Sequence, residues 1–183
     1  EPDNTETPVN KGFPITLPAV PVVAVNATNA AILMPDGELK ILSHVQAQKM
    51  LHKQAVMVCH APFVRARLKL DDILAFDVLE LFAFVHPAKF CVPTPAGLNK
   101  FLGLNAPASF DDYPFAILES AQALLTDLQS ESPESESRLN PLLVAEVMGL
   151  GGKGWPWTPF IFSAFGKVYD PLRAAMPKNA LHV

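Results

Sequence analysis

The chain has 183 residues, of which half are apolar and 17% are charged, and its formal net charge is −4. These values predict one folded domain with a hydrophobic core. They argue against a strong, general nucleic-acid binder, which needs clustered Lys and Arg. Two cysteines, Cys59 and Cys91, are too few for a disulfide scaffold or for a zinc or iron–sulfur site built from cysteines. Because no apolar run could span a bilayer and residues 1–12 have no signal pattern, we expect a cytoplasmic protein without a membrane partner.

Short apolar or alternating segments predict strands in the first third of the chain. The turn signal Pro35-Asp36-Gly37 joins two of these segments in a hairpin. The residues before Val22 are polar or interrupted by proline, so we expect 1–21 to form a flexible lead-in. The expected strands are 22–26, 30–34, 38–42 and 55–59.

Apolar residues at helical spacing predict helices in the rest of the chain, most regularly over 114–128. A low-complexity Ser/Glu segment, 130–138, predicts a mobile linker between a core over 22–129 and a helical, proline-broken tail over 139–183. Strands come first and helices later, so the class is α/β, or α+β, with a small mixed sheet flanked by helices. The expected helices are 44–54, 63–69, 77–84, 95–102, 114–128, 141–148 and 160–168.

Charge is distributed unevenly along the chain. Residues 40–69 carry basic side chains and no acid, whereas 111–136 carry acidic side chains and no base. This separation predicts a one-sided basic patch that could contact nucleic acid, and a solvated surface of mixed charge is the alternative. The candidate nucleic-acid contacts are Lys49, Lys53, Arg65, Arg67 and Lys69.

The segment Val58-Cys59-His60-Ala61-Pro62-Phe63 resembles the His-Asn-Ala-Pro-Phe-Asp motif of the DnaQ-like, or DEDD, 3′–5′ exonucleases. Residues 77–81 resemble that family's Asp-Thr-Leu-Glu-Leu helix start, and 88–104 and 114–128 follow in the family's order. The resemblance covers about residues 22–128, and it implies a ribonuclease H-like fold.

The same resemblance implies a nuclease site that lacks the residues needed for catalysis. The family cleaves phosphodiesters with two metal ions held by four carboxylates, and no carboxylate stands at the matching positions here. We therefore expect no catalytic residue and no metal ligand, and the alternative is an active exonuclease with non-standard ligands. For His60, a hydrogen-bonded structural role is the other interpretation. The degenerate motif positions are Asn26, Thr28, His60, Val64, Phe115 and Ser120.

A second resemblance is to the amino-terminal region of alphaproteobacterial DinG-type ATP-dependent DNA helicases. It is carried by residues 33–38, 79–90, 92–98 and 154–157. It implies an accessory domain for DNA repair whose partner is the helicase motor of the same polypeptide. That motor would use ATP and Mg²⁺, whereas we expect no cofactor for this chain, since Gly149–Gly154 lacks the Gly-Lys-Ser/Thr ending of a phosphate loop.

Two non-catalytic functions follow. The first is a weak contact with single-stranded DNA through the basic residues, with salt-dependent affinity. The second is an interdomain scaffold in which Trp155 and Trp157 contact a partner, although packing of these two residues onto the core is the alternative. The net acidity of the chain slightly favours the scaffold.

Overall fold

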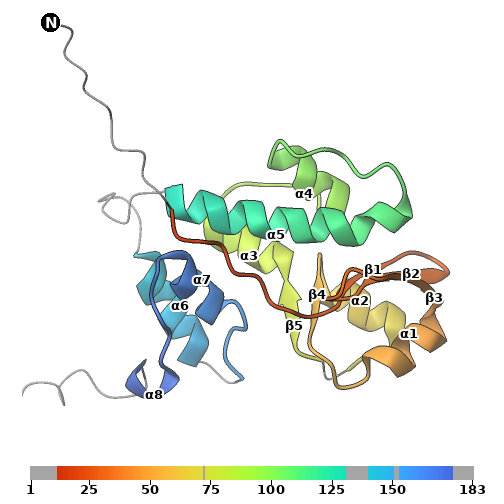
Figure 1. Ribbon diagram of the computed structural model, residues 1–183, viewed down its shortest axis with the longest axis horizontal. Coiled ribbons are helices and arrows are strands. Elements are labelled where there is room, and N and C mark those ends of the chain that lie inside the picture. The colour runs from red at the N-terminus through yellow and green to blue at the C-terminus, as the bar shows by residue number, and fades with distance from the viewer. Residues whose placement is uncertain (1–11, 72, 131–139, 151–152, 175–183) are drawn as a thin grey trace, which may run out of the picture.

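The computed structural model describes residues 12–71, 73–130, 140–150 and 153–174 (Figure 1). The expected α/β class is confirmed, because a five-stranded mixed sheet has helices on both faces. The strand order, β3-β2-β1-β4-β5, is consistent with a ribonuclease H-like arrangement. The strands are β1 (Val22–Val25), β2 (Asn29–Leu33), β3 (Leu39–Ser43), β4 (Val56–Val58) and β5 (Ala75–Asp77).

The first three strands form an antiparallel meander, and β4 and β5 run parallel to β1. The hairpin between β2 and β3 turns at Pro35-Asp36-Gly37, as expected, with Gly37 at φ +90°. The Gly37 N–H donates to the Met34 carbonyl at 2.9 Å. Glycine suits this position because a side chain at positive φ is strained. Strands β1 and β4, which pair in parallel, are short and fully buried, which explains their unbroken apolar sequences.

The helices form two layers around the sheet (Figure 1). Helices α1 and α2 cover one face, where they enclose a core around Val23, Ile32 and Val58. Helices α3 and α5 cover the other face with the tail helix α7, around Met57 and Ile117. The helices are α1 (His44–Leu51), α2 (Ala61–Leu68), α3 (Val78–Val85), α4 (Pro95–Phe101), η1 (Phe110–Asp112), α5 (Tyr113–Ser130), α6 (Pro141–Leu150), α7 (Thr158–Ala164) and α8 (Pro171–Ala174). None of the described helices combines the length and apolar character needed to cross a bilayer.

Three expectations about the chain's organisation need correction. Strand β5 was not expected, and Asp77, placed in a helix by its sequence, is the last residue of that strand and the N-cap of α3. Residues 12–21 of the expected flexible lead-in are not loose, since Ile15, Leu17 and Val20 pack against the core. Ser130 belongs to α5 and not to the linker, and residues 131–138 of that linker lie outside the described residues.

The tail is part of the core. The Trp157 side chain is 0% exposed, and its ring packs edge-on against Phe76 of β5, with ring centroids 5.3 Å apart. Its indole N–H donates to the Asp77 carbonyl at 2.9 Å. Trp155 is 8% exposed and donates to Glu80 Oε2 at 3.1 Å. The proposal that Trp155 and Trp157 offer an exposed partner surface is therefore wrong, because burial and hydrogen bonding commit both indoles to the core.

Candidate functional site

A pocket lies at the carboxyl ends of β1 and β4, where the chain leaves these neighbouring parallel strands. Crevices at such positions are the common ligand sites of open α/β sheets. The pocket has a volume of about 400 Å³, and we call it the β1–β4 pocket. Its lining residues come from β1, the end of β4, and the starts of α2, α4 and α5: Val23, Ala24, Val25, Cys59, His60, Phe63, Val64, Pro93, Thr94, Pro95, Tyr113 and Ile117.

Two of the six degenerate motif positions, His60 and Val64, line this pocket. His60 is exposed and is the N-cap residue of α2, but its side chain makes no capping hydrogen bond. The interpretation of His60 as a hydrogen-bonded structural residue thus gains no support from the cap. Val64 is 3% exposed and belongs to the core under α2.

Asn26 and Thr28 do not line the pocket. They form the turn between β1 and β2, where Asn26 Oδ1 accepts the backbone N–H groups of Thr28 at 2.9 Å and of Asn29 at 2.7 Å. Such local side-chain bonds are the usual role of asparagine between two strands. The β1 side chains at the pocket are instead Val23, Ala24 and Val25.

Phe115 and Ser120 also lie away from the pocket. Phe115 is 42% exposed, and the buried Ser120 hydroxyl donates to Asn99 Oδ1 of α4 at 2.7 Å. The α5 residues that reach the pocket are Tyr113 and Ile117. The structure therefore does not bring Asn26, Thr28, Phe115 and Ser120 together with His60 and Val64 at this pocket.

The lining of the β1–β4 pocket does not fit a pair of divalent metal ions. Mg²⁺ and Mn²⁺ prefer carboxylate oxygen ligands, and no lining residue is Asp or Glu. Over the described ranges, no cluster of three or more His, Cys, Asp or Glu side chains could hold a metal ion. The donor atoms here are those of His60, Thr94, Tyr113 and Cys59.

Cys59 is not a nucleophile in this environment. Burial raises the pKa of its thiol from 9.0 to about 12, with smaller contributions from Asp77 and from Cys91. A protonated thiol is a weak nucleophile and a weak metal ligand. Burial also raises the pKa of Cys91. Both cysteines are free thiols.

Asp77 joins three elements, β5, α2 and α3. Its carboxylate is 2% exposed and accepts three backbone N–H groups. One comes from Ala61 at the start of α2, at 2.6 Å, and two come from the first turn of α3. Because all three donors are backbone groups, Asp77 positions the starts of the two helices.

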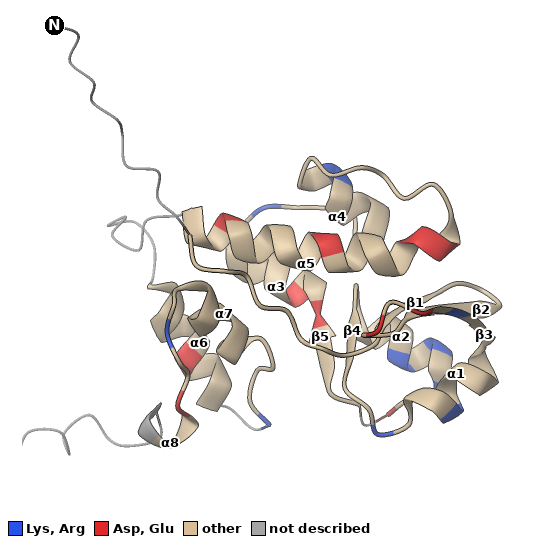
Figure 2. Cartoon of the chain, viewed as in Figure 1, with Lys and Arg blue, Asp and Glu red and all other residues tan. Residues whose placement is uncertain are grey.

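The predicted basic residues gather on the α1–α2 layer (Figure 2). The two helices are linked where the Gln48 side-chain amide donates to the Lys69 carbonyl at 3.1 Å. The Arg67 guanidinium lies over the ring of Phe63, 5.3 Å from its centroid. We call Lys49, Lys53, Arg67 and Lys69, all of them exposed, the basic surface.

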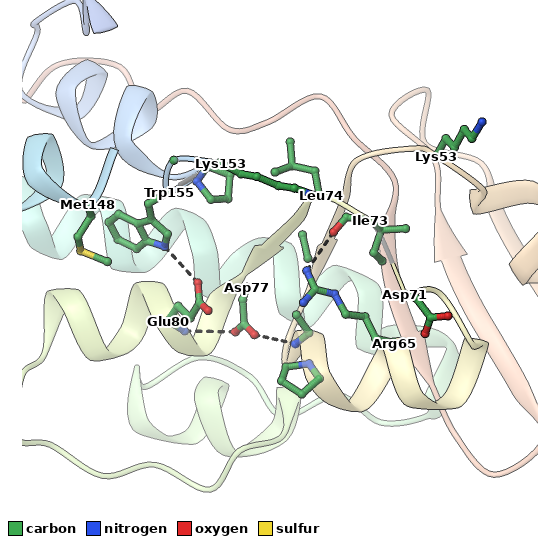
Figure 3. A pocket seen from close by; sticks show the side chains of 15 residues that line it. Lys53, Arg65, Asp71, Ile73, Leu74, Asp77, Glu80, Met148, Lys153 and Trp155 are labelled. Carbon is green, nitrogen blue, oxygen red and sulfur yellow. Dashed lines mark hydrogen bonds between the residues drawn. The ribbon is translucent and has the colours of Figure 1, made fainter. Parts of the chain in front are cut away.

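Arg65 differs from the other candidate contacts. It is half-buried, and its Nη2 donates to the Ile73 carbonyl at 3.0 Å. It lines a second, open cavity of about 910 Å³ between α2, β5 and the tail loop 153–156 (Figure 3). Three cationic side chains line this cavity beside three carboxylates, so the cavity has no excess of positive charge. The charged residues in its lining are Lys53, Arg65, Lys153, Asp71, Asp77 and Glu80.

An apolar stripe runs along α6 in the tail. Leu143, Val147 and Leu150 follow helical spacing and are 44%, 62% and 46% exposed. The sequence showed this helix but not which side faces the solvent. The exposed apolar side chains of the described tail thus include this stripe and not the two tryptophans.

No protein-family model, no curated protein and no solved structure matches this chain.

Proposed function

We propose that this chain is a non-catalytic accessory domain that makes a weak, sequence-independent contact with single-stranded DNA through its basic surface. The association with a DNA helicase motor rests on the sequence resemblance alone. The observation that carries the DNA contact is the separation of charge between the two helical layers of the fold.

On the α1–α2 layer, four exposed cations lie within two packed helices and the residues that follow them. On the opposite layer, η1 and α5 carry Asp111, Asp112, Glu119 and Asp127 and no basic residue. Helix α4, which packs on α5, adds one cation, Lys100, so the acidic side chains still outnumber the basic ones on these three elements. A phosphate backbone is therefore attracted more strongly to the first layer than to the second. A net charge of −4 thus remains compatible with a local, one-sided contact.

The proposal predicts how affinity depends on salt. Each phosphate contact on a single strand contributes about 0.7 to the slope of log affinity against log salt. Three contacts, through Lys49, Arg67 and Lys69, give a slope of roughly −2. Such a contact is weak at physiological salt, where non-specific binding has a Kd of about 10⁻⁴ to 10⁻⁶ M.

The test is fluorescence anisotropy of a labelled single-stranded oligonucleotide at several salt concentrations. The triple variant Lys49→Gln, Arg67→Gln, Lys69→Gln should lose the salt-dependent binding. The matched control, Lys89→Gln, Lys100→Gln, Lys167→Gln, changes the net charge by the same amount at exposed positions outside the α1–α2 layer and should bind as the unmodified chain does. Equal losses in both variants would show that overall charge, not the basic surface, controls binding.

A second candidate function is an interdomain scaffold, and the α6 stripe favours it. Exposed apolar side chains at helical spacing are typical of helix-in-groove contacts. If the stripe is covered by another part of the polypeptide, the isolated chain should self-associate through it. Sedimentation velocity would show association that Val147→Glu removes, together with no DNA binding. A monomer at all concentrations would count against the scaffold.

The exonuclease alternative receives no support from the donor set of the β1–β4 pocket. It is tested in the anisotropy experiment by adding Mn²⁺. A decrease in anisotropy caused by shortened oligonucleotide, and dependent on Mn²⁺, would overturn the non-catalytic assignment.

A further inference from the structure

The β1–β4 pocket has the dimensions and chemistry of a small-molecule site. Its volume of about 400 Å³ falls in the range of pockets that enclose drug-sized ligands, roughly 300–1,000 Å³. Its floor is fixed, because Val23 of β1 and Ile117 of α5 are both 0% exposed and lie in the two cores on either side of the sheet. Strand β1 and helix α5 therefore fix one part of the pocket, and the segments that precede α2 and α4 complete it.

The lining selects against charged ligands. No Lys, Arg, Asp or Glu is among the residues that line the pocket, which are mainly Val, Ala, Pro, Phe and Ile. A charge buried without a partner is costly, and Cys59 stays protonated because burial raises its pKa to about 12. A phosphate or a carboxylate would find no counter-ion among the residues that line this pocket, and the neighbouring Arg67 guanidinium is stacked on the ring of Phe63.

The mouth of the pocket selects for a flat ring. Phe63 is 44% exposed there, and the Arg67 guanidinium lies over its ring. Tyr113, which is half-buried, contributes a second aromatic ring from α5. Two aromatic side chains favour stacked or edge-on contact with an aromatic ligand. The hydroxyls of Thr94 and Tyr113 and the His60 imidazole are the polar groups that could orient it.

We propose that the β1–β4 pocket binds an uncharged aromatic small molecule, and that it does so independently of the basic surface. This inference goes beyond the proposed DNA contact, which uses the outer side of α1 and α2. Failure of either one leaves the other standing, since the pocket ligand is uncharged whereas the DNA strand is anionic. The two sites meet at one point, where Arg67 of the basic surface lies over the ring of Phe63.

The test uses two fluorescent probes that differ by one sulfonate group. N-phenyl-1-naphthylamine is uncharged and 1-anilinonaphthalene-8-sulfonate is its anionic counterpart. We expect saturable binding of the uncharged probe to the whole chain, at least about tenfold tighter than binding of the anion, a difference of about 1.4 kcal/mol. Equal affinity for the two probes would overturn the assignment of an uncharged ligand.

Two further measurements place the probe. In the amide NMR spectrum, the uncharged probe should shift the signals of residues 23–25, 59–64 and 113–117, and shifts on the α6 stripe instead would overturn the proposal. Phe63→Ala should weaken binding about tenfold, whereas the control Phe90→Ala removes a ring that is 81% exposed and does not line the pocket, and should have no effect. Release of the probe by single-stranded DNA would overturn the independence of the two sites.

Discussion

Replacing Asp77 by asparagine tests the junction where β5 ends and α2 and α3 begin. The carboxylate accepts from the Ala61 N–H through Oδ2 at 2.6 Å and from the N–H groups of Leu79 and Glu80 through Oδ1 at 2.9 and 3.2 Å. Asparagine has nearly the same shape, but one of its two side-chain atoms is an N–H₂ donor. Whichever way the carboxamide turns, at least one backbone N–H faces a nitrogen.

The expected loss follows from burial. With the side chain 2% exposed, water cannot replace a lost acceptor. A hydrogen bond to a charged group contributes about 1.5–3 kcal/mol, and a buried donor left unpaired costs about 1–3 kcal/mol. We expect Asp77→Asn to lower the free energy of unfolding by roughly 2–3 kcal/mol. For a domain of this size that corresponds to a decrease in Tm of about 4–12 °C.

The assay is urea unfolding followed by circular dichroism. Asp36→Asn is the matched control, since Asp36 also accepts a backbone N–H, that of Glu38 at 3.1 Å, but on an exposed turn. The control should change stability by less than about 0.5 kcal/mol. Asp77→Ser separates the capping of α3 from the hydrogen bond to Ala61, because serine can cap α3 but is too short to reach Ala61. Equal effects of Asp77→Asn and Asp36→Asn would refute the reasoning.

Three further predictions concern the Cys59 thiol, Trp157 of the tail and the segment 12–20 that precedes β1. Burial raises the pKa of the Cys59 thiol from the ordinary value of 9.0 to about 12, so the thiol stays protonated to a higher pH in the folded state than in the unfolded state. Stability should therefore fall as the pH rises above about 9, by roughly 2 kcal/mol at about pH 10.5, and Cys59→Ala should remove that part of the slope in urea unfolding. Trp157→Phe removes the N–H donated to the end of β5 and part of a buried ring, so the urea midpoint should decrease with a loss of roughly 2–3 kcal/mol. Gln129→Ala removes two hydrogen bonds, of 2.6 and 2.9 Å, to the carbonyls of Phe13 and Ala164. It should speed amide hydrogen exchange in residues 12–20, and unchanged exchange would contradict the role of Gln129.

Features with a local cause were predictable from the sequence. The apolar runs around Val23 and Met57, the Pro35-Asp36-Gly37 turn and the helix 114–128 each depend on neighbouring residues, and each appears in the structure. Strand β5 was missed because it has three residues and exists through pairing with β4, which its own sequence does not signal. The packing of Trp157 could not be predicted from the sequence either, because Phe76, which its ring contacts, is distant along the chain.

The sequence did not predict which residues meet at the β1–β4 pocket. Of the six degenerate motif positions only His60 and Val64 line it, and the other lining residues are mainly apolar side chains brought together by the fold. Asn26 and Thr28 lie between two apolar strands, and this pattern of Asn and Thr, visible in the sequence, is a turn signal.

The burial of Trp157 has a consequence for the order in which the protein can fold during synthesis. The hydrogen bond from its indole to the Asp77 carbonyl spans 80 residues of chain. When all five strands have emerged from the ribosome, Trp157 has not yet been made. Phe76 therefore stays uncovered by Trp157 until the tail emerges. At about 5–20 residues per second, synthesis leaves that edge open for several seconds or more. We therefore expect the nascent domain to be most prone to aggregation or chaperone capture after β5 and before α7 has been made.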